Sequence, residues 1–304
     1  MTRRTIPNSS MAVSPICLGT MTFGTPVAEP EAIVLVQHAL EMGINFIDTA
    51  NMYEGYARVP GSAGGVAEEI VGKAVSGRRG DFVIATKVGM KVGDTPEDEG
   101  TSAASIRKHL ELSLRRLSTD YVDIYYLHKP DPDASLLETL QELDAAIKEG
   151  KILSYGTSNY NGEQMEELLR VADANGLPRP VITQPGMSLL KQDALFDLLP
   201  LCEQEGIAVA PYQVLQGGLL TGKYRRGQNT PAGSRAAEKA GWVWERSEEL
   251  FDKLEGIEAE ANANALTMTQ YAIRWASQQP AVVSAIVGVK RIEQLDAAIG
   301  AVLG

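Results

Sequence analysis

The sequence has few of the features that mark several common classes of protein. It contains only two cysteines, Cys17 and Cys202, and because they lie far apart in apolar surroundings we expect buried, reduced thiols. Its 28 Lys and Arg residues are outnumbered by 39 Asp and Glu residues, the formal charge is -11, and no run of Lys or Arg exceeds two. Nucleic-acid binding requires a basic face for phosphate contacts, so this balance argues against a nucleic-acid partner.

Long apolar runs are also missing. No run reaches the roughly 18 residues of a membrane-spanning helix, and residues 1–5 carry charge without a following apolar core, which argues against a signal peptide. We therefore expect no membrane partner and a cytoplasmic location. With 304 residues and 44% hydrophobic content, the chain can bury a large core in one large domain or two ordinary ones.

The sequence does contain a regular alternation of short apolar segments and amphipathic segments. The apolar segments, typical of buried strands, cover residues 16–20, 44–48, 82–87, 122–128, 152–159, 181–184, 207–212 and 282–286. The amphipathic segments predict helices at residues 30–42, 66–75, 101–117, 135–148, 162–174, 192–205, 259–277 and 292–301. A long loop, 213–240, follows the strand at 207–212 and precedes the helix at 259–277.

Eight such units of similar size, with no Pro-rich or Ser-rich linker between them, predict parallel strands in a closed barrel. The alternative is an open, doubly wound sheet. Such a sheet normally carries a G-x-G-x-x-G turn after an early strand if it binds a dinucleotide, and the sequence has none. We therefore predict an α/β fold, a (β/α)8 TIM barrel, with residues 1–304 as a single domain.

Polar residues stand where the predicted strands end, which is where the chemistry of this fold is found. In chain order they are Thr20, Asp48, Lys87, His128, Ser158, Asn159, Gln184, Tyr212 and Gly288. A buried Asp, Lys and His at one mouth of a barrel is too costly to be explained by packing alone.

Each of these residues also has a structural interpretation when it is taken alone. Asp48 suits a helix cap, Lys87 a strand-end lysine in solvent, and His128 a hydrogen-bonded core histidine. Asn159 and Gln184 suit ties between backbone segments. Two further histidines, His38 and His109, lie inside predicted helices, where we expect surface positions. The combination at one face favours a functional site.

Tyr53, five residues after Asp48, suggests the chemistry. The sequence has no evident activated Ser or Cys and no cluster with metal-ligand spacing, so nucleophilic or metal-dependent hydrolysis is poorly supported and no metal is predicted. A tyrosine beside a lysine suits proton delivery to a carbonyl oxygen. A free phenol has a pKa of about 10 and is a slow acid at neutral pH.

Lys87 is the group expected to lower the pKa of the Tyr53 phenol. A cation about 4 Å away contributes up to about 4 kcal/mol, enough to lower the phenol pKa by up to about 3 before desolvation opposes it. Asp48 would hold Lys87, and His128 would donate a hydrogen bond to the substrate oxygen. These groups polarise a carbonyl but supply no hydride, so a nicotinamide cofactor is required.

The chain resembles the aldo/keto reductases over nearly its whole length. The segments that carry the resemblance are GINFIDTANMY, VIATKVG, YYLH, YGTSN, the apolar strand into Gln184, VAPYQVLQGGLLTGKY and AIVGVKRIEQL. The resemblance implies a TIM barrel that binds NADP(H) across its C-terminal face. It also implies a catalytic tetrad of Asp48, Tyr53, Lys87 and His128, with Tyr53 as the proton donor and acceptor.

The resemblance further implies the cofactor contacts. Ser158, Asn159 and Gln184 would bind the carboxamide, with Tyr212 stacked under the nicotinamide ring. The expected contacts of the phosphates, the adenine end and the remaining cofactor surface are Gln213, Leu215, Gly217, Leu219, Lys223, Arg235, Gly288, Lys290, Gln294, Thr20, Met21 and Asp48. Lys290 and Arg291, at a strand-to-helix junction, fit an anion site independently, the alternative being an ordinary surface pair.

Departures from the family pattern indicate the substrate. Lys129 follows His128 where many relatives place an aromatic residue, and Met21 stands where some have tryptophan. With Tyr53 and His128 as the other substrate contacts, these changes favour a small polar, possibly sugar-derived or anionic, aldehyde or ketone. The predicted function is NADPH-dependent reduction of such a carbonyl. The alternative is a cofactor-binding regulatory subunit with little turnover, like the channel-associated relatives of the family; the sequence predicts no oligomeric state.

Overall fold

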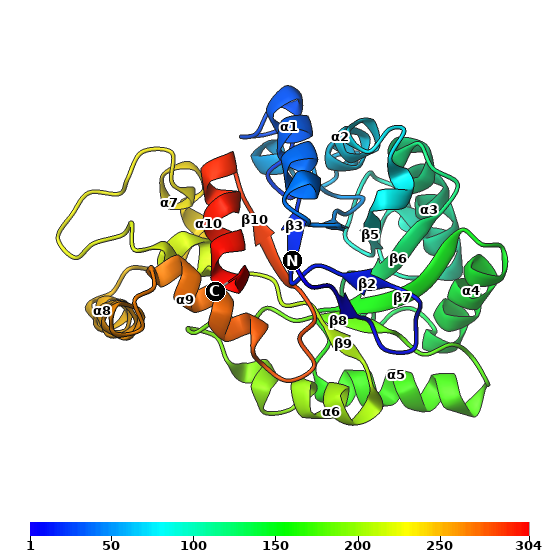
Figure 1. Ribbon diagram of the computed structural model, residues 1–304. Coiled ribbons are helices and arrows are strands. Elements are labelled where there is room, and N and C mark those ends of the chain that lie inside the picture. The colour runs from blue at the N-terminus through cyan, green and yellow to red at the C-terminus, as the bar shows by residue number, and fades with distance from the viewer. Residues whose placement is uncertain (304) are drawn as a thin grey trace.

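Eight parallel strands form the centre of the molecule in the computed structural model, which describes residues 1–303 (Figure 1). They are β3 (Ile16–Gly19), β4 (Phe46–Asp48), β5 (Val83–Val88), β6 (Val122–Leu127), β7 (Ile152–Ser158), β8 (Ile182–Gln184), β9 (Ala208–Val209) and β10 (Ala285–Gly288). Their order is β10-β3-β4-β5-β6-β7-β8-β9. A parallel bridge between Val209 and Val282 joins β9 to the segment that enters β10, so the sheet closes. The predicted (β/α)8 fold is confirmed.

Helices surround this sheet. They are α1 (Glu29–Glu41), α2 (Val66–Ala74), α3 (Ala103–Leu117), α4 (Leu136–Lys148), α5 (Gly162–Ala174), α6 (Leu198–Glu205), α9 (Met268–Ser277) and α10 (Ile292–Leu303). Side-chain oxygens cap many of their amino ends, as Ser102 does for α3 and Asn161 for α5. The segment between β9 and α9, which holds α7 (Arg235–Glu238) and α8 (Glu248–Ala263), extends to one side of the barrel (Figure 1).

The core has two main parts because side chains alternate along each strand. Ile16 and Leu18 of β3 pack outward against the helices, whereas Cys17 between them packs inside the barrel. In β4, Ile47 points outward and Phe46 inward in the same way. Cys17 and Cys202 are both free and buried, as expected.

An amino-terminal hairpin, not predicted from the sequence, covers the amino end of the barrel. It consists of β1 (Arg4–Thr5) and β2 (Ala12–Val13), antiparallel strands too short to give a recognisable pattern. Ile6, Met11 and Val13 join the apolar cluster inside the barrel. The hairpin therefore packs apolar side chains against residues of the barrel interior at this end.

Two predicted helices are wrong in extent. In place of one helix at 259–277 the chain forms α8 and α9, separated at residues 264–267, where Ala265 has a left-handed φ of 54° and Thr267 caps α9. In place of a helix at 192–205, only α6 is α-helical, and a 3-10 turn at Asp193–Leu195 precedes it. The sequence pattern that predicts these helices runs on across both breaks, so it does not show where each helix ends.

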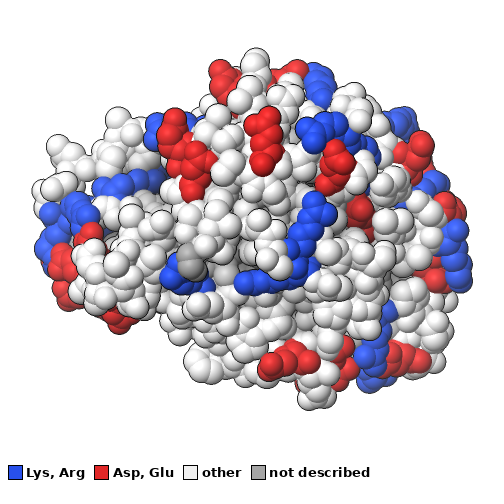
Figure 2. All heavy atoms as spheres, in the orientation of Figure 1, with Lys and Arg blue, Asp and Glu red and all other residues white. Residues whose placement is uncertain are grey.

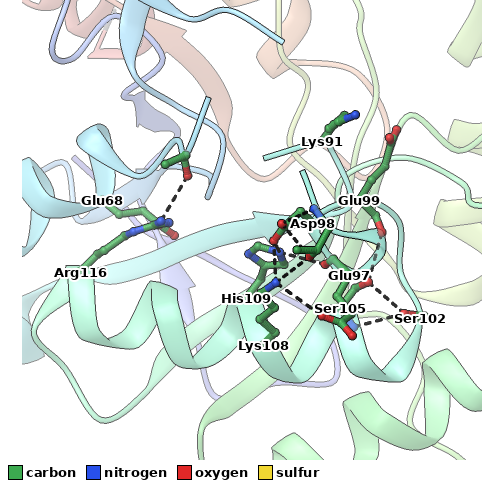
Figure 3. A network of polar contacts seen from close by, with 12 residues as sticks. Glu68, Lys91, Glu97, Asp98, Glu99, Ser102, Ser105, Lys108, His109 and Arg116 are labelled. Carbon is green, nitrogen blue, oxygen red and sulfur yellow. Dashed lines mark hydrogen bonds and ion pairs between the residues drawn. The ribbon is translucent and has the colours of Figure 1, made fainter. Parts of the chain in front are cut away.

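The surface position predicted for His109 is also wrong. His109 is buried in α3, and its Nε2 lies 3.0 Å from the Glu97 carbonyl oxygen and 3.4 Å from Asp98 (Figure 3). Burial lowers the pKa of this imidazole. The other helical histidine, His38, is half-buried and contacts Asp296 at 2.7 Å.

Among the described residues, no helix has both the length and the apolar character needed to cross a membrane. On the face seen in Figure 2, Lys and Arg side chains lie close to Asp and Glu side chains and are separated by uncharged areas. That face therefore offers no continuous basic surface.

Candidate active site

The polar residues at the strand ends meet because of the same alternation. In four strands, a polar residue within one position of the carboxyl end stands two positions beyond an apolar residue of the barrel interior. The two side chains therefore point the same way. These pairs are Phe46 and Asp48, Ala85 and Lys87, Tyr126 and His128, and Ile182 and Gln184. Strand pairing places Gly19 beside Asp48, and Ser158 beside Gln184.

Lys87 is the centre of the resulting network. Its buried ammonium donates to Asp48 Oδ2 at 2.7 Å, to the Thr49 carbonyl oxygen at 2.8 Å and to the Tyr53 hydroxyl at 3.2 Å. Asp48 is fixed on its other side, where Gln184 Nε2 donates to Oδ1 at 2.7 Å. The two charges are 1% and 3% exposed and each is fully paired, which is the condition for stable burial.

Tyr53 and His128 stand side by side above this network. Their ring centroids are 6.0 Å apart at an interplanar angle of 79°, an edge-on contact, and the Lys87 ammonium lies 4.7 Å from the Tyr53 ring centroid. Within residues 1–303, His128 Nδ1 is buried without a hydrogen-bond partner.

The environment sets the protonation of these groups. Burial lowers the pKa of Lys87, but Asp48 and Tyr53 together raise it above its usual value, so the ammonium stays charged. Burial, assisted by the Lys87, Arg58 and Lys129 charges, holds the pKa of His128 well below its usual range, so the imidazole is neutral at pH 7.

The expectation that Lys87 lowers the pKa of Tyr53 below its usual value is wrong. Burial raises the pKa of the phenol, and Lys87 offsets only part of that effect. Desolvation therefore outweighs the lysine charge. The phenol is fully protonated at neutral pH.

These groups lie in a cavity of about 750 Å³ at the carboxyl ends of the strands. The predicted site residues that line it are Thr20, Met21, Asp48, Tyr53, Lys87, His128, Lys129, Ser158, Asn159, Gln184, Tyr212, Gln213, Leu215, Gly217, Lys223, Arg235, Gly288, Lys290 and Gln294. Leu219 is the exception. Its side chain is buried in an apolar cluster with Leu220, Tyr224 and Phe251.

Comparison with known proteins agrees with this geometry. The sequence model of the Aldo/keto reductase family matches residues 15–303. This chain belongs to the aldo/keto reductase family. Members of this family generally carry out carbonyl reduction with a nicotinamide cofactor.

Individual relatives cover almost the whole chain. It is 34% identical to the uncharacterized oxidoreductase YrpG of Bacillus subtilis over 97% of this chain and 89% of that one. It is 33% identical, with the same coverage, to a probable voltage-gated potassium channel subunit beta of Arabidopsis thaliana. Among solved structures, the glycerol dehydrogenase AKR11B4 from Gluconobacter oxydans superposes with a TM-score of 0.82 at 28% identity, covering 99% of this chain and 90% of that one.

In this aldo/keto reductase the amides beside the tetrad are already hydrogen-bonded. Asn159 donates to the His128 carbonyl oxygen at 2.7 Å, and its Oδ1 accepts from the Tyr212 hydroxyl at 2.6 Å. An ionised Asp48 can only accept hydrogen bonds, so the Gln184 side chain must turn its Nε2 toward Asp48. Its Oε1 is left as an acceptor for other groups. Asn159 thus ties strand ends together, the structural alternative considered from the sequence.

Cations gather at the other end of the cavity. Lys290 contacts the Gly233 carbonyl oxygen at 3.0 Å and the Glu238 carboxylate. Loss of water around Lys223 lowers the pKa of its ammonium, and the charges of Lys290, Arg235 and Arg291 lower it further. Mutual repulsion among four cations is relieved by a polyanion, so this end fits the phosphates of a dinucleotide.

Sequence reasoning missed Tyr56, which lines the cavity between its two ends. Its ring lies edge-on to Trp242 at 5.5 Å, and its hydroxyl accepts from Arg235 Nε at 3.1 Å. It thereby joins the segment after Tyr53 to the one that carries α7. No sequence signal marks this contact, because it depends on how two irregular segments pack.

Asp98 organises the loop after β5, as the network of polar contacts in Figure 3 shows. Its carboxylate accepts from the Thr95 amide at 2.9 Å and the Thr95 hydroxyl at 2.8 Å, and pairs with Lys108 of α3 at 2.8 Å. The bond from Lys108 chiefly holds the pKa of Asp98 well below its usual range. The loop that carries Met90 into the cavity wall is therefore anchored to α3.

Proposed function

We propose that this protein reduces a small polar aldehyde or ketone to the alcohol with NADPH, and that Tyr53 donates the proton. The observation that carries the proposal is the position of Tyr53 in the cavity wall. Its hydroxyl lies 3.2 Å from the buried Lys87 ammonium, and its ring is edge-on to His128. This is the arrangement that proton delivery to a carbonyl oxygen requires.

Each residue of the tetrad has a separate task. Tyr53 holds the proton, and the Lys87 cation stabilises the phenolate that remains when the proton leaves. Asp48 keeps Lys87 charged and in place. Neutral His128 donates a hydrogen bond to the carbonyl oxygen and orients it. When bound, the nicotinamide supplies the hydride.

Charge at the far end of the cavity supports NADPH as the cofactor. Lys290 and Arg291 follow Gly288 at the end of β10, with Lys223 and Arg235 nearby. The 2'-phosphate is the feature that distinguishes NADPH from NADH, and it is best bound by such a cluster. The free, buried cysteines fit our expectation of a cytoplasmic enzyme.

The wall around Tyr53 supports a small polar substrate. Met21, Met52 and Met90 line this end of the cavity, together with the ammonium-bearing Lys129. The flexible methionine side chain adapts to substrates of different shape. A lysine ammonium binds polar or anionic groups. Sugar-derived aldehydes combine these properties.

The substitution Tyr53→Phe tests the proposal. It removes the proton donor and leaves the ring, so kcat should fall by about 100-fold to 10,000-fold. NADPH binding, measured by quenching of protein fluorescence, should change less than about twofold because the hydroxyl is not part of the expected phosphate site. A variant with full activity would refute the assignment of Tyr53.

The second candidate is a regulatory subunit with little turnover. It is favoured by the 33% identity to probable potassium channel beta subunits of Arabidopsis thaliana and Oryza sativa. The complete set of Asp48, Tyr53, Lys87 and His128 favours the enzyme. Tight NADPH binding with no reduction across a panel of aldehydes and ketones, and a stable complex with a larger protein, would reverse this choice.

A further inference from the structure

A buried carboxylate lies outside the barrel, against the strand that carries Lys87. It belongs to Glu68, in the first turn of α2, which is fully buried. Its Oε1 accepts from the Thr86 hydroxyl of β5 at 2.6 Å, and its Oε2 accepts from Arg116 Nη1 of α3 at 3.1 Å. Figure 3 shows Glu68 and Arg116 side by side. A buried charge that the proposed reaction does not use requires an explanation.

The bond to Thr86 meets β5 at the residue before Lys87. Ile84 of this strand packs in the outer apolar cluster, and Ala85 packs in the inner one. Because side chains alternate along a strand, Thr86 faces α2 whereas Lys87 faces the cavity. The hydrogen bond between Glu68 and Thr86 therefore ties the backbone beside the tetrad ammonium to α2.

The same turn of α2 also holds the segment that carries Tyr53. The amide of Ala67, the residue before Glu68, donates to the Tyr53 carbonyl oxygen at 3.0 Å. Tyr53 lies five residues beyond the end of β4 and outside any strand, so it depends on such contacts for its position. Two adjacent residues of α2 thus hold Tyr53 and the strand of Lys87 together, and the two side chains meet at 3.2 Å.

Arg116 fixes the turn that leads from the Tyr53 segment into α2. Its Nη2 donates to the Ala63 carbonyl oxygen at 3.3 Å. A Cβ atom on Gly65 would lie only 2.3 Å from the guanidinium carbon, so the backbone at Gly65 is in direct contact with Arg116. The pair of Glu68 and Arg116 therefore holds both the start of α2 and the turn before it against α3.

Packing alone does not account for a carboxylate at this position. Burial raises the pKa of Glu68, and the hydrogen bonds from Thr86 and Arg116 are among those that offset part of this effect. A well-packed apolar side chain of similar size is often as stable as a buried ion pair. What the carboxylate provides in addition is directed contact with a strand on one side and a helix on the other.

We propose that Glu68 is a positioning residue, which holds the Tyr53 hydroxyl against the Lys87 ammonium through the start of α2 and through Thr86. This inference rests on the proposed function, because it concerns the placement of the proposed proton donor. Glu68 does not line the cavity, so it acts only through these neighbours. A displacement of the donor by about 1 Å is enough to lower the rate by up to about 100-fold.

The first test removes the tie without changing any charge. Thr86→Val keeps the shape of the side chain and loses the hydroxyl. With the aldehyde or ketone that the wild type reduces fastest, kcat should fall by roughly tenfold to 100-fold, whereas KM and the Kd of NADPH should change less than about threefold. The control is Thr139→Val on α4, which loses a buried hydrogen bond to the Thr101 carbonyl oxygen at 2.7 Å and should leave kcat unchanged.

The second test varies the carboxylate itself. Glu68→Ala should lower kcat at least as much as Thr86→Val. Glu68→Gln keeps the length of the side chain and a bond to the Thr86 hydroxyl, so kcat should stay within about threefold of the wild type. The control is Asp123→Ala, near the amino end of β6, which removes a carboxylate paired with Arg79 at 2.6 Å. It should lose stability to urea but keep kcat. Thr86→Val decides if Glu68→Ala does not fold.

A third measurement does not depend on turnover. The distance between the Lys87 ammonium and the Tyr53 hydroxyl is 3.2 Å. In crystals of Thr86→Val it should lengthen beyond hydrogen-bond range, and in crystals of Thr139→Val it should stay the same.

Other outcomes decide against the positioning role. If kcat is unchanged in Thr86→Val and Glu68→Ala, or falls equally in Thr139→Val and Asp123→Ala, the carboxylate only stabilises the fold and the inference is overturned. An unchanged distance in Thr86→Val overturns it as well. If the wild type reduces no aldehyde or ketone, or if Tyr53→Phe is fully active, it is the proposed function that fails, and the distance in Thr86→Val still decides the inference.

Discussion

The two ends of the cavity are held in opposite ways. At the tetrad, Asp48, Lys87 and Gln184 belong to strands, are at most 3% exposed and bond to one another. At the end where Lys223, Arg235 and Lys290 gather, Lys290 lies in the turn after β10 and Glu238 ends the short helix α7. The side chains of this pair are 23% and 32% exposed, and Lys290 also contacts the Gly233 carbonyl oxygen. The first arrangement is fixed when the barrel folds. The second consists of contacts that a ligand can replace.

The difference suits the two tasks. Proton transfer requires groups held within a few tenths of an ångström, and strands with paired, buried charges provide this without a change on binding. A large anionic cofactor must enter and leave, so the groups around its phosphates need exchangeable partners in water. We infer that the chemistry is preorganised and the cofactor end is adjustable.

The sharpest way to break this comparison is Lys87→Met. It leaves the Asp48 carboxylate buried without a cation, so the free energy of unfolding should fall by about 3–5 kcal/mol. Turnover should fall by more than about 100-fold, because the pKa of Tyr53 rises further when the cation that lowers it is gone. Stability is measured by urea unfolding and turnover by NADPH consumption.

The double variant with Asp48→Asn separates the two effects. It removes both charges, so it should regain stability but remain inactive. In the residual activity, the alkaline limb of the pH profile for reduction, where Tyr53 loses its proton, should move to higher pH. No limb near pH 6.5 is expected in the wild type, because the pKa of His128 lies well below that value. Activity restored in the double variant would contradict the role given to Lys87.

A smaller effect is expected from Lys290→Gln at the adjustable end. Loss of this charge should raise the Kd of NADPH by roughly tenfold, whereas the Kd of NADH and the unfolding free energy should hardly change. Lys253→Gln, an exposed lysine of α8, is the matched control. Equal weakening of NADPH and NADH would place Lys290 away from the 2'-phosphate.

The smallest effect is expected from Glu238→Gln. Its carboxylate is paired with the Lys290 ammonium. In the proposed complex, the 2'-phosphate of NADPH must replace this carboxylate. Exposed ion pairs contribute about 0.2–1 kcal/mol, so its removal should tighten NADPH binding by up to about fivefold. Glu249→Gln on α8 serves as the control. Weaker NADPH binding would mean that Glu238 supports the site and does not compete for it.

The contrast between residues on strands and residues on irregular segments also explains which parts of the site the sequence predicts. The convergence of Asp48, Lys87 and His128 follows from two rules, that side chains alternate along strands and that parallel strands end at one face. Both rules depend on local pattern, which a single sequence contains. The structure brings these residues together as the pattern requires.

Contacts between irregular segments are not encoded in this way. Tyr56 meets Arg235, and Arg58 meets the Lys91 carbonyl, only through the packing of loops that have no period. The buried position of His109 depends likewise on a loop folding over α3. The direction of the Tyr53 pKa was missed because it is a balance between burial and charge, and the degree of burial is a property of the whole fold.

The closure of the barrel sets the order of events during synthesis. β3 is the first barrel strand to leave the ribosome, yet one of its two partners is β10, the last. Until residues 285–288 emerge, one edge of β3 has no strand to pair with, and such an edge promotes association between chains. One edge of the nascent sheet therefore stays open through most of translation, and the contacts of Lys290, just after β10, are among the last that the chain makes.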